Sequence, residues 1–164
     1  MVNCAHDGTN PSGVILGASG SLIGNALEGG VYGFGMIFQL LPPAQPGGIW
    51  TETGWNFRGG AGANFPYTPV LDPASGVLYG VSQFGGDGSS CTNPNGCGTA
   101  FALTPPSQPG SAWSETLLLP FRGNPGEYPF APLILGNDGA LYGTTNGLTD
   151  FSQGPFGTVI QLQP

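Results

Sequence analysis

The sequence predicts an all-β fold made of repeated four-stranded units, and three observations support this class. Similar segments return about every 63 residues along the 164-residue chain, as they do in propellers, solenoids and other repeat proteins. Apolar segments of strand length alternate with turns that contain many of the 31 glycines and 17 prolines. No stretch shows sustained helical periodicity. The equal spacing favours β-propeller blades over a sandwich or a jelly roll, which would not explain it.

Four sets of matching segments define the repeat. Segment 13–17 is matched to 76–80 and 139–143, and segment 35–40 to 98–103 and 157–162. Segment 50–53 is matched to 113–116, and segment 57–59 to 121–123, one residue out of step. We therefore divide the chain into a polar N-terminal arm, residues 1–12, and one repeat domain, residues 13–164. The repeats span about 13–65, 66–128 and 129–164.

The second unit shows the four strands most clearly. They are predicted at 67–71, 77–82, 99–104 and 113–121, from alternation and from β-branched and aromatic content. Turns rich in glycine and proline at 72–76 and 105–110 separate them, together with a loop that contains two cysteines. In the third unit, Asn137-Asp138-Gly139 is a strong hairpin signal between the first two strands.

The first and third units look incomplete. Residues 3–10 are polar where a first strand of the first unit is expected, and the sequence ends after the third strand of the third unit. About two and a half blades cannot close a ring, and open strand edges invite pairing with another chain. We therefore expect self-association or a fragment of a longer protein. A twofold dimer with five or six blades is the simplest closed assembly.

The net charge argues against several classes of partner, and the N-terminal residues do not resemble a signal peptide. Nine acidic residues, two arginines and no lysine give a net charge of −7, which argues against nucleic acid and against an anionic membrane surface. No apolar run is long enough to cross a bilayer. The N-terminal residues lack the basic start and apolar core of a signal peptide. Either a signal has been removed or export does not use that route.

Cys91 and Cys97 bracket a short loop and have three alternative states. A disulfide would rigidify the loop in an oxidising compartment, and free thiols are the main rival. A metal pair has less support, because a zinc site would need further His or Cys ligands nearby. Cys4 is left over and is expected to be free.

The charged residues predict a site at one end of the units. Because successive strands alternate in direction, the loops between second and third strands and the links between units should emerge at the same end. The links carry Arg58, Arg122 and Glu127, and the loops carry Glu28, Asp87 and Asp150. The two arginines share a repeat position, so they either connect neighbouring units or bind a carbonyl or an anion. Glu52 and Glu115 also recur, and are expected to be exposed strand residues or partners of these arginines.

Several phrases resemble the tandem GloVer repeat. They are residues 139–145, Phe84-Gly85-Gly86, residues 98–103 and Trp113-Ser114-Glu115-Thr116. The resemblance covers nearly the whole chain after residue 12, although the first copy has Ile15-Leu16-Gly17 in place of Leu-Tyr-Gly. The repeat occurs in bacterial, mostly exported proteins and is thought to form propellers. The resemblance therefore implies a propeller and an extracellular or periplasmic location, and implies almost nothing about activity.

Two functions are compatible with these features. The first is a small hydrolase that opens lactone or ester bonds with calcium assistance, similar in length and repeat type to an N-acyl-homoserine lactone hydrolase that quenches quorum sensing. In it, Asp87 and Asp150 would bind Ca²⁺, Glu28 or Glu127 would act as the base, and Arg58 or Arg122 would orient the carbonyl. The alternative is a non-catalytic module of a secreted propeller that binds glycan, peptide or sister subunits.

Overall fold

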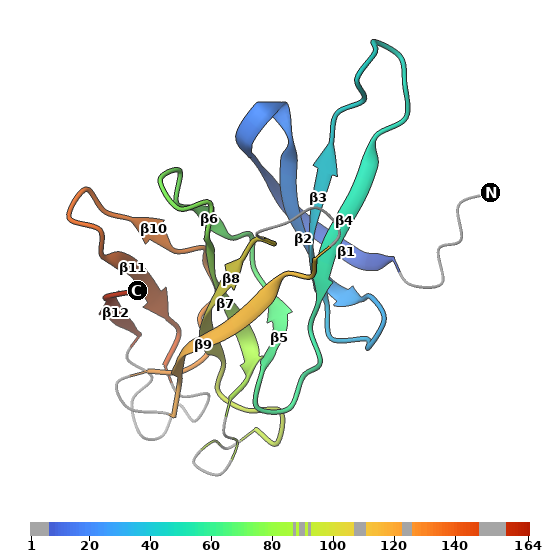
Figure 1. Ribbon diagram of the computed structural model, residues 1–164. Helices are drawn as coiled ribbons and strands as arrows, with labels where there is room; N and C mark the ends of the chain where they lie inside the picture. Colours follow the sequence, from blue (N-terminus) through green and yellow to red (C-terminus); the bar gives the residue numbers. More distant parts are fainter. Residues whose placement is uncertain are drawn as a thin grey trace.

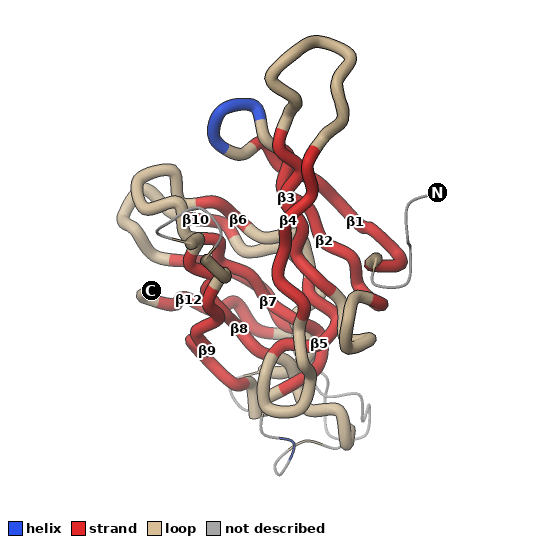
Figure 2. The backbone as a smooth tube through the Cα atoms, turned by 45° about the vertical axis from the view of Figure 1, so that its right-hand side comes forward, coloured by secondary structure: helices blue, strands red, loops and turns tan. Residues whose placement is uncertain are grey.

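The computed structural model describes residues 7–86, 88, 91, 93–106, 111–122, 126–147 and 157–164. In these residues the chain forms three antiparallel sheets and a three-residue 3-10 turn, Ala18–Gly20. The sheets follow one another across the molecule in chain order, with the second between the first and the third (Figures 1 and 2). The predicted all-β class is confirmed.

The first sheet has the order β1-β2-β3-β4. Its strands are β1 (Gly8–Leu16), β2 (Leu22–Gly29), β3 (Met36–Leu41) and β4 (Thr51–Asn56). The expectation that this unit lacks its first strand was wrong, because β1 pairs with β2 from Gly8 to Leu16. Polar side chains such as Thr9 and Ser12 are compatible with this strand because it lies at the sheet edge, where side chains remain exposed.

The second sheet has the order β5-β7-β8-β9, with β6 also paired to β7. Its strands are β5 (Ala63–Pro66), β6 (Val70–Leu71), β7 (Leu78–Gly85), β8 (Thr99–Thr104) and β9 (Ser114–Pro120). Of the strand predicted at 67–71, only Val70–Leu71 (β6) is a strand, and β5 ends just before the predicted span. Pro66 and Pro69 flank the interruption, and neither has a backbone N–H to donate to the ladder. The strand predicted at 99–104 coincides with β8.

The third sheet consists of β10 (Ile134–Leu135), β11 (Leu141–Thr145) and β12 (Thr158–Leu162), in that order. The turn predicted around residues 137–139 joins β10 to β11. Gly139 adopts a φ of 78° in this turn, and its N–H donates to the Gly136 carbonyl at 3.0 Å. A positive φ is one that glycine adopts without steric cost.

The strand registers correct the repeat alignment of the first unit. In each sheet a glycine of the second strand faces an apolar residue of the third: Gly24 faces Phe38, Gly80 faces Phe101, and Gly143 faces Ile160. Segment 76–80 therefore corresponds to 20–24, and the match to 13–17 was wrong. Gly80 follows Gly24 by 56 residues and Gly143 follows Gly80 by 63. The missing seven residues lie in the loop between the second and third strands, which is longer in the second unit.

A β-bulge explains why segment 121–123 is one residue out of step with 57–59. In the pairing of β8 with β9, Ala100 faces Leu119 whereas Phe101 faces Leu117, so Leu118 has no opposite residue. A bulge of this kind inserts one residue into one strand and leaves the pairing on both sides intact.

Two apolar cores lie between successive sheets. The first combines Ile23, Ile37 and Phe57 with Leu78, Phe101 and Leu103, and the rings of Phe57 and Phe101 meet edge to face at 5.0 Å. The second combines Val81, Ala100 and Phe121 with Leu141 and Ile160. Each sheet is therefore held mainly by the sheet before it and the sheet after it.

Candidate functional site

The described loops and links that were predicted to carry the site leave the first two sheets at corresponding ends. In Figure 1 the β2–β3 loop and the β4–β5 link leave the lower end of the first sheet, and the β7–β8 loop leaves the lower end of the second. The tight turns between the first two strands of each sheet lie at the opposite end. This follows from the alternating direction of antiparallel strands.

Arg58 lies at this end and stacks on an aromatic ring. Its guanidinium carbon is 4.7 Å from the ring centroid of Tyr32 in the β2–β3 loop, a cation–π distance. Both side chains are exposed. Arg58 therefore connects the loop and the link of its own unit.

A groove of about 700 Å³ lies beside this pair, between the first and second sheets. Trp55 of β4 and Trp113, just before β9, form its aromatic walls, and Arg58 and Tyr32 lie at its rim. Gln39, Thr53 and Asn56 add polar atoms. The groove thus combines flat apolar surface with a few hydrogen-bonding groups, as small-ligand sites do.

Glu115 links the two sheets along this groove. Its carboxylate accepts the indole N–H of Trp55 at 3.1 Å and the backbone N–H of Ala63 at 3.3 Å. The expectation was an exposed residue or an arginine partner, and the structure instead gives Glu115 a role in sheet packing. Its recurrence after a tryptophan was the signal available in the sequence. Glu52, at the same position of the first sheet, is exposed.

Sequence reasoning missed Asn25, which is fully buried between the first two sheets. Its Oδ1 accepts hydrogen bonds from the hydroxyls of Ser12 at 3.0 Å and Thr68 at 2.8 Å. Its Nδ2 donates to the Pro66 carbonyl at 2.8 Å. No repeat signal could reveal this residue, because the registers place Val81 in the corresponding position of the second sheet.

The carboxylates predicted to act in catalysis lie in different units. Glu28 is half-buried on β2 opposite Thr9, whereas Glu127 lies in the link that follows β9 and is buried. Arg122 lies exposed just after β9. Asp87 and Asp150 fall outside the described residues. Among the residues that are described, no three His, Cys, Asp or Glu side chains gather into a group that could hold a metal ion.

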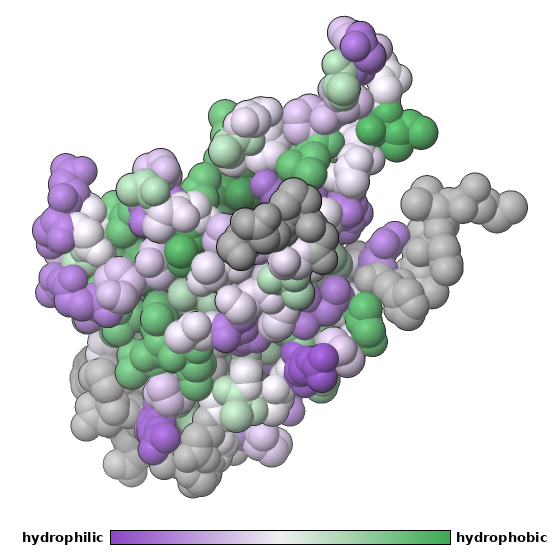
Figure 3. Space-filling model, viewed as in Figure 1, coloured by the Kyte–Doolittle hydropathy of each residue, from purple (hydrophilic) through white to green (hydrophobic). Residues whose placement is uncertain are grey.

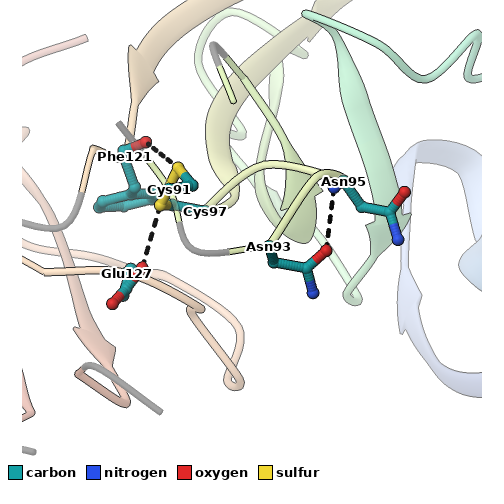
Figure 4. Close-up of a disulfide and its surroundings, with 6 residues drawn as sticks. All are labelled: Cys91, Asn93, Asn95, Cys97, Phe121 and Glu127. Atoms are coloured by element: carbon teal, nitrogen blue, oxygen red, sulfur yellow. Dashed lines mark hydrogen bonds between the residues drawn. A yellow bond between two sulfur atoms is a disulfide. The ribbon is translucent and has the colours of Figure 1, made fainter. Parts of the chain in front are cut away.

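Cys91 and Cys97 form a disulfide, with their Cα atoms 5.6 Å apart. Figure 4 shows Glu127 directed at this bond, with its Oε2 3.0 Å from the Cys97 sulfur. Cys97 and Glu127 both have an exposed fraction of 0%. The other carboxyl oxygen of Glu127, Oε1, is buried and has no hydrogen-bond partner among the described residues.

The Glu127 carboxyl lies against the disulfide in a buried environment. A disulfide sulfur carries no proton, so a hydrogen bond in this contact would need the carboxyl O–H as its donor and the sulfur as its acceptor. Burial raises the pKa of Glu127, because an apolar environment disfavours the charged carboxylate. Burial therefore favours the neutral form of the carboxyl group that lies beside the disulfide.

Comparison with known proteins identifies a family. No helix in the described part of the chain is long and apolar enough to span a membrane. No curated protein and no solved structure matches the sequence. The family model of the Gloeobacter/Verrucomicrobia repeat matches residues 1–157. That match covers nearly the whole chain, so the protein belongs to the Gloeobacter/Verrucomicrobia repeat family.

Proposed function

We propose that this chain is a non-catalytic assembly module, whose sheets are β-propeller blades that associate head to tail with further copies of the chain. The described chain contains two interfaces between successive sheets. The first and third sheets each leave one half of a further interface of this kind exposed, and this observation carries the proposal. Equivalent positions in the three sheets are those that the strand registers align.

The outer face of the first sheet corresponds to a face that is buried in the second. Leu78, Phe101 and Leu103 of the second sheet have exposed fractions of 0–1% because they pack on the first sheet. Their equivalents Leu22, Phe38 and Leu40 are only partly buried. The same three positions thus carry apolar side chains that no other described sheet covers.

The outer face of the third sheet shows the complementary feature. Ile37 of the first sheet and Ala100 of the second are 3% and 0% exposed, and each packs towards the following sheet. The register places Val159 at the same position of the third sheet, where it is 80% exposed. Figure 3 shows apolar surface around the end of β9 next to the third sheet, and also on the β3–β4 hairpin.

Two backbone joints recur at the internal interfaces. The N–H of Phe65 donates to the Phe34 carbonyl at 3.2 Å, and the N–H of Tyr128 donates to the Cys97 carbonyl at 2.7 Å. A proline follows each donor residue and packs on a glycine of the preceding unit. A Cβ added to Gly35 would lie 2.6 Å from Cδ of Pro66, and a Cβ added to Gly98 would lie 2.7 Å from Cδ of Pro129.

Both halves of this joint recur, exposed, in the outer sheets. Asn10, Phe65 and Tyr128 share a positive φ of 55°, 60° and 53°, and each precedes a proline. Pro11 is nevertheless exposed, whereas Pro66 and Pro129 are buried. Gly157 is likewise exposed, whereas Gly35 and Gly98 are buried. Pro11 of one copy and Gly157 of another would therefore complete the joint.

Glu52 marks the place that a preceding sheet would fill. It lines a hollow of about 290 Å³ on the first sheet together with Pro11, Phe38 and Leu40. In the second sheet the equivalent Glu115 accepts the indole of Trp55 from the preceding sheet. Because the two outer faces differ, the contact is heterologous, and it closes into a ring or extends into a filament. A second copy is the occupant that supplies both missing halves.

The test is the mass in solution by light scattering at several concentrations. We expect assemblies larger than the 16.6 kDa chain, and expect Phe38→Glu and Val159→Glu each to yield monomers. An equimolar mixture of the two variants should form a one-to-one dimer, because one intact interface remains between them. Ile49→Glu is the matched control, since Ile49 is 92% exposed on the β3–β4 loop. A wild-type chain that stays monomeric at every concentration overturns the proposal.

The calcium-assisted lactone hydrolase stays a prediction. Its proposed ligands Asp87 and Asp150 lie outside the described residues, and Glu127 is buried beside a disulfide. Opening of a lactone ring releases acid, so a pH-indicator assay on acyl-homoserine lactones with and without EDTA tests it. EDTA-sensitive turnover by the monomeric Phe38→Glu variant would separate a catalytic function from assembly.

A further inference from the structure

We propose that Cys91 and Cys97 form an exchangeable disulfide that an external dithiol reduces, and that Glu127 is the proton donor to the Cys97 sulfur. The proposal is independent of the assembly proposed above. It rests on the unequal burial of the two sulfurs and on the position of the Glu127 carboxyl.

The two cysteines differ in exposure, which selects the sulfur that is attacked. Cys91 is partly exposed, whereas Cys97 is 0% exposed. Thiol–disulfide exchange requires that the incoming thiolate reach the sulfur in line with the bond that breaks. Cys91 is therefore the more exposed of the two residues, so we assign its Sγ as the electrophile and Cys97 Sγ as the leaving group.

Each sulfur has an oxygen nearby that suits the reduced form. The Phe121 carbonyl lies 3.9 Å from Cys91 Sγ, and Glu127 Oε2 lies 3.0 Å from Cys97 Sγ (Figure 4). In the disulfide neither sulfur has a proton to donate. In the dithiol, each S–H can donate to one of these oxygens. The site therefore provides hydrogen-bond acceptors for the reduced, dithiol form of the two cysteines.

The Glu127 side chain has no other polar contact among the described residues. Oε1 is buried without a partner, and Oε2 contacts only the sulfur. Among the described residues, the titratable groups next to it are Cys97, which is tied in the disulfide, and Tyr128, which follows Glu127 in the chain and whose buried hydroxyl has no hydrogen-bond partner. A purely structural carboxyl would be expected to satisfy both oxygens, because an unpaired buried polar atom costs stability. A proton donor needs only one directed oxygen.

The reaction can be written with its protons and electrons balanced. A thiolate of the external dithiol attacks Cys91 Sγ, the S–S bond breaks, and its electron pair passes to Cys97 Sγ. The proton moves from Glu127 Oε2 to that sulfur, which leaves a Glu127 carboxylate. The second thiol of the reductant, as its thiolate, then displaces Cys91, which takes a proton from water. The dithiol leaves as a cyclic disulfide, and Glu127 regains its proton from solvent.

Proton transfer in this direction is favourable. A thiol has an ordinary pKa near 8.5, above that of a carboxyl group, and burial of Cys97 disfavours a thiolate further. Without Glu127 a thiolate would form in a site with no exposed surface. The acid thus lowers the barrier at the sulfur that cannot reach water.

The test is the rate of disulfide reduction by dithiothreitol as a function of pH, in the wild type and in Glu127→Gln. Glutamine keeps the shape and neutrality of the protonated acid but cannot transfer a proton. General acid catalysis usually contributes factors of 10² or more, so we expect at least a roughly tenfold slower reduction in the variant. The two rates should converge above the pKa of Glu127. Tyr128→Phe, which alters the neighbouring buried group, should be reduced at the wild-type rate.

Equal rates and equal pH profiles for the wild type and Glu127→Gln would overturn the proposal. If the glutamine variant does not fold, infrared spectroscopy of the oxidised wild type decides. A protonated carboxyl band must then be present at a pH just above the ordinary carboxyl range. Its absence would also overturn the proposal.

Discussion

The first and second sheets carry the same apolar pattern in different surroundings. Leu78, Phe101 and Leu103 are buried in the second sheet, while the equivalent residues of the first sheet remain partly exposed. The repeat therefore specifies a face, and only the neighbouring sheet determines whether that face forms a core. These residues are equivalent because β2 pairs with β3 in the same register as β7 pairs with β8.

The two internal junctions also differ. Asn25 connects the first sheet to the second through two hydrogen bonds, to the Pro66 carbonyl and from the Thr68 hydroxyl, whereas the equivalent Val81 contributes an apolar contact between the second and third. The third sheet has Thr144 at this position, and it is exposed. One repeat position thus hosts a buried polar centre, a buried apolar side chain and a surface residue.

The largest expected effect concerns the central aromatic of the two faces. Phe101→Ala removes a fully buried ring that packs on Phe57, and should lower the free energy of unfolding by about 3–5 kcal/mol. Phe38→Ala should cost much less in dilute solution, because its ring is already partly exposed. Urea denaturation of both variants measures the difference.

Urea denaturation of the same two variants at higher protein concentration gives a second test. If copies associate, the stability cost of Phe38→Ala should increase with protein concentration, because this ring would lie in the contact between copies. The cost of Phe101→Ala should change less with concentration, because this ring is buried within one chain. Equal costs in dilute solution would contradict the difference in burial.

A smaller effect is expected at Asn25, the buried polar residue between the first and second sheets. Asn25→Ala leaves the Pro66 carbonyl and two hydroxyls without their partner, and should cost about 1–3 kcal/mol. Thr144→Ala is the matched control on the exposed face, where substitutions usually change stability by less than about 0.5 kcal/mol. Thermal or urea unfolding measures both, and equal losses would argue against the role assigned to Asn25.

The smallest effect is expected in the turns between first and second strands. Asp138 accepts hydrogen bonds from the Tyr142 hydroxyl at 2.7 Å and the Ala140 N–H at 3.1 Å, and these hold the pKa of its carboxyl below the usual value. A lowered folded-state pKa adds stability above the unfolded-state pKa, which is lost as the pH falls through the folded-state pKa. The first sheet has no acid in its Ala18–Gly20 turn.

Asp138→Asn should therefore lower the melting temperature slightly at neutral pH. The difference from the wild type should disappear on acidification. Asparagine keeps the turn geometry, so a difference that does not vary with pH would show that charge has no part in it.

Several elements could be predicted because their signals are local. The strand at 99–104 coincides with β8 since alternating side chains and flanking turn residues mark both ends. The alignment of the first unit failed for a physical reason. Ile15-Leu16-Gly17 and Leu22-Ile23-Gly24 are similar, and the shorter β2–β3 loop shifts the second of them away from a constant period. Loop length is free to vary between repeats because loops lie outside the core.

The candidate site was less predictable. Glu127 was expected to be an accessible base, since acidic residues in links are usually exposed, but it is buried against the Cys97 sulfur. Glu115 was identified as a recurring residue, and its partners Trp55 and Ala63 lie 60 and 52 residues away. Partners at such separations depend on how the sheets pack, and no pattern within a strand encodes them.

By itself, the sequence determined the strands, the turns and the repeating apolar face, because backbone pairing and side-chain alternation depend on near neighbours. Tertiary structure decided which copies of that face are covered, and which polar groups are enclosed with them. Burial and hydrogen bonding at Asn25, Glu115 and Glu127 arise only when one sheet or link meets another. The chemistry of these residues is therefore a property of the contacts between units.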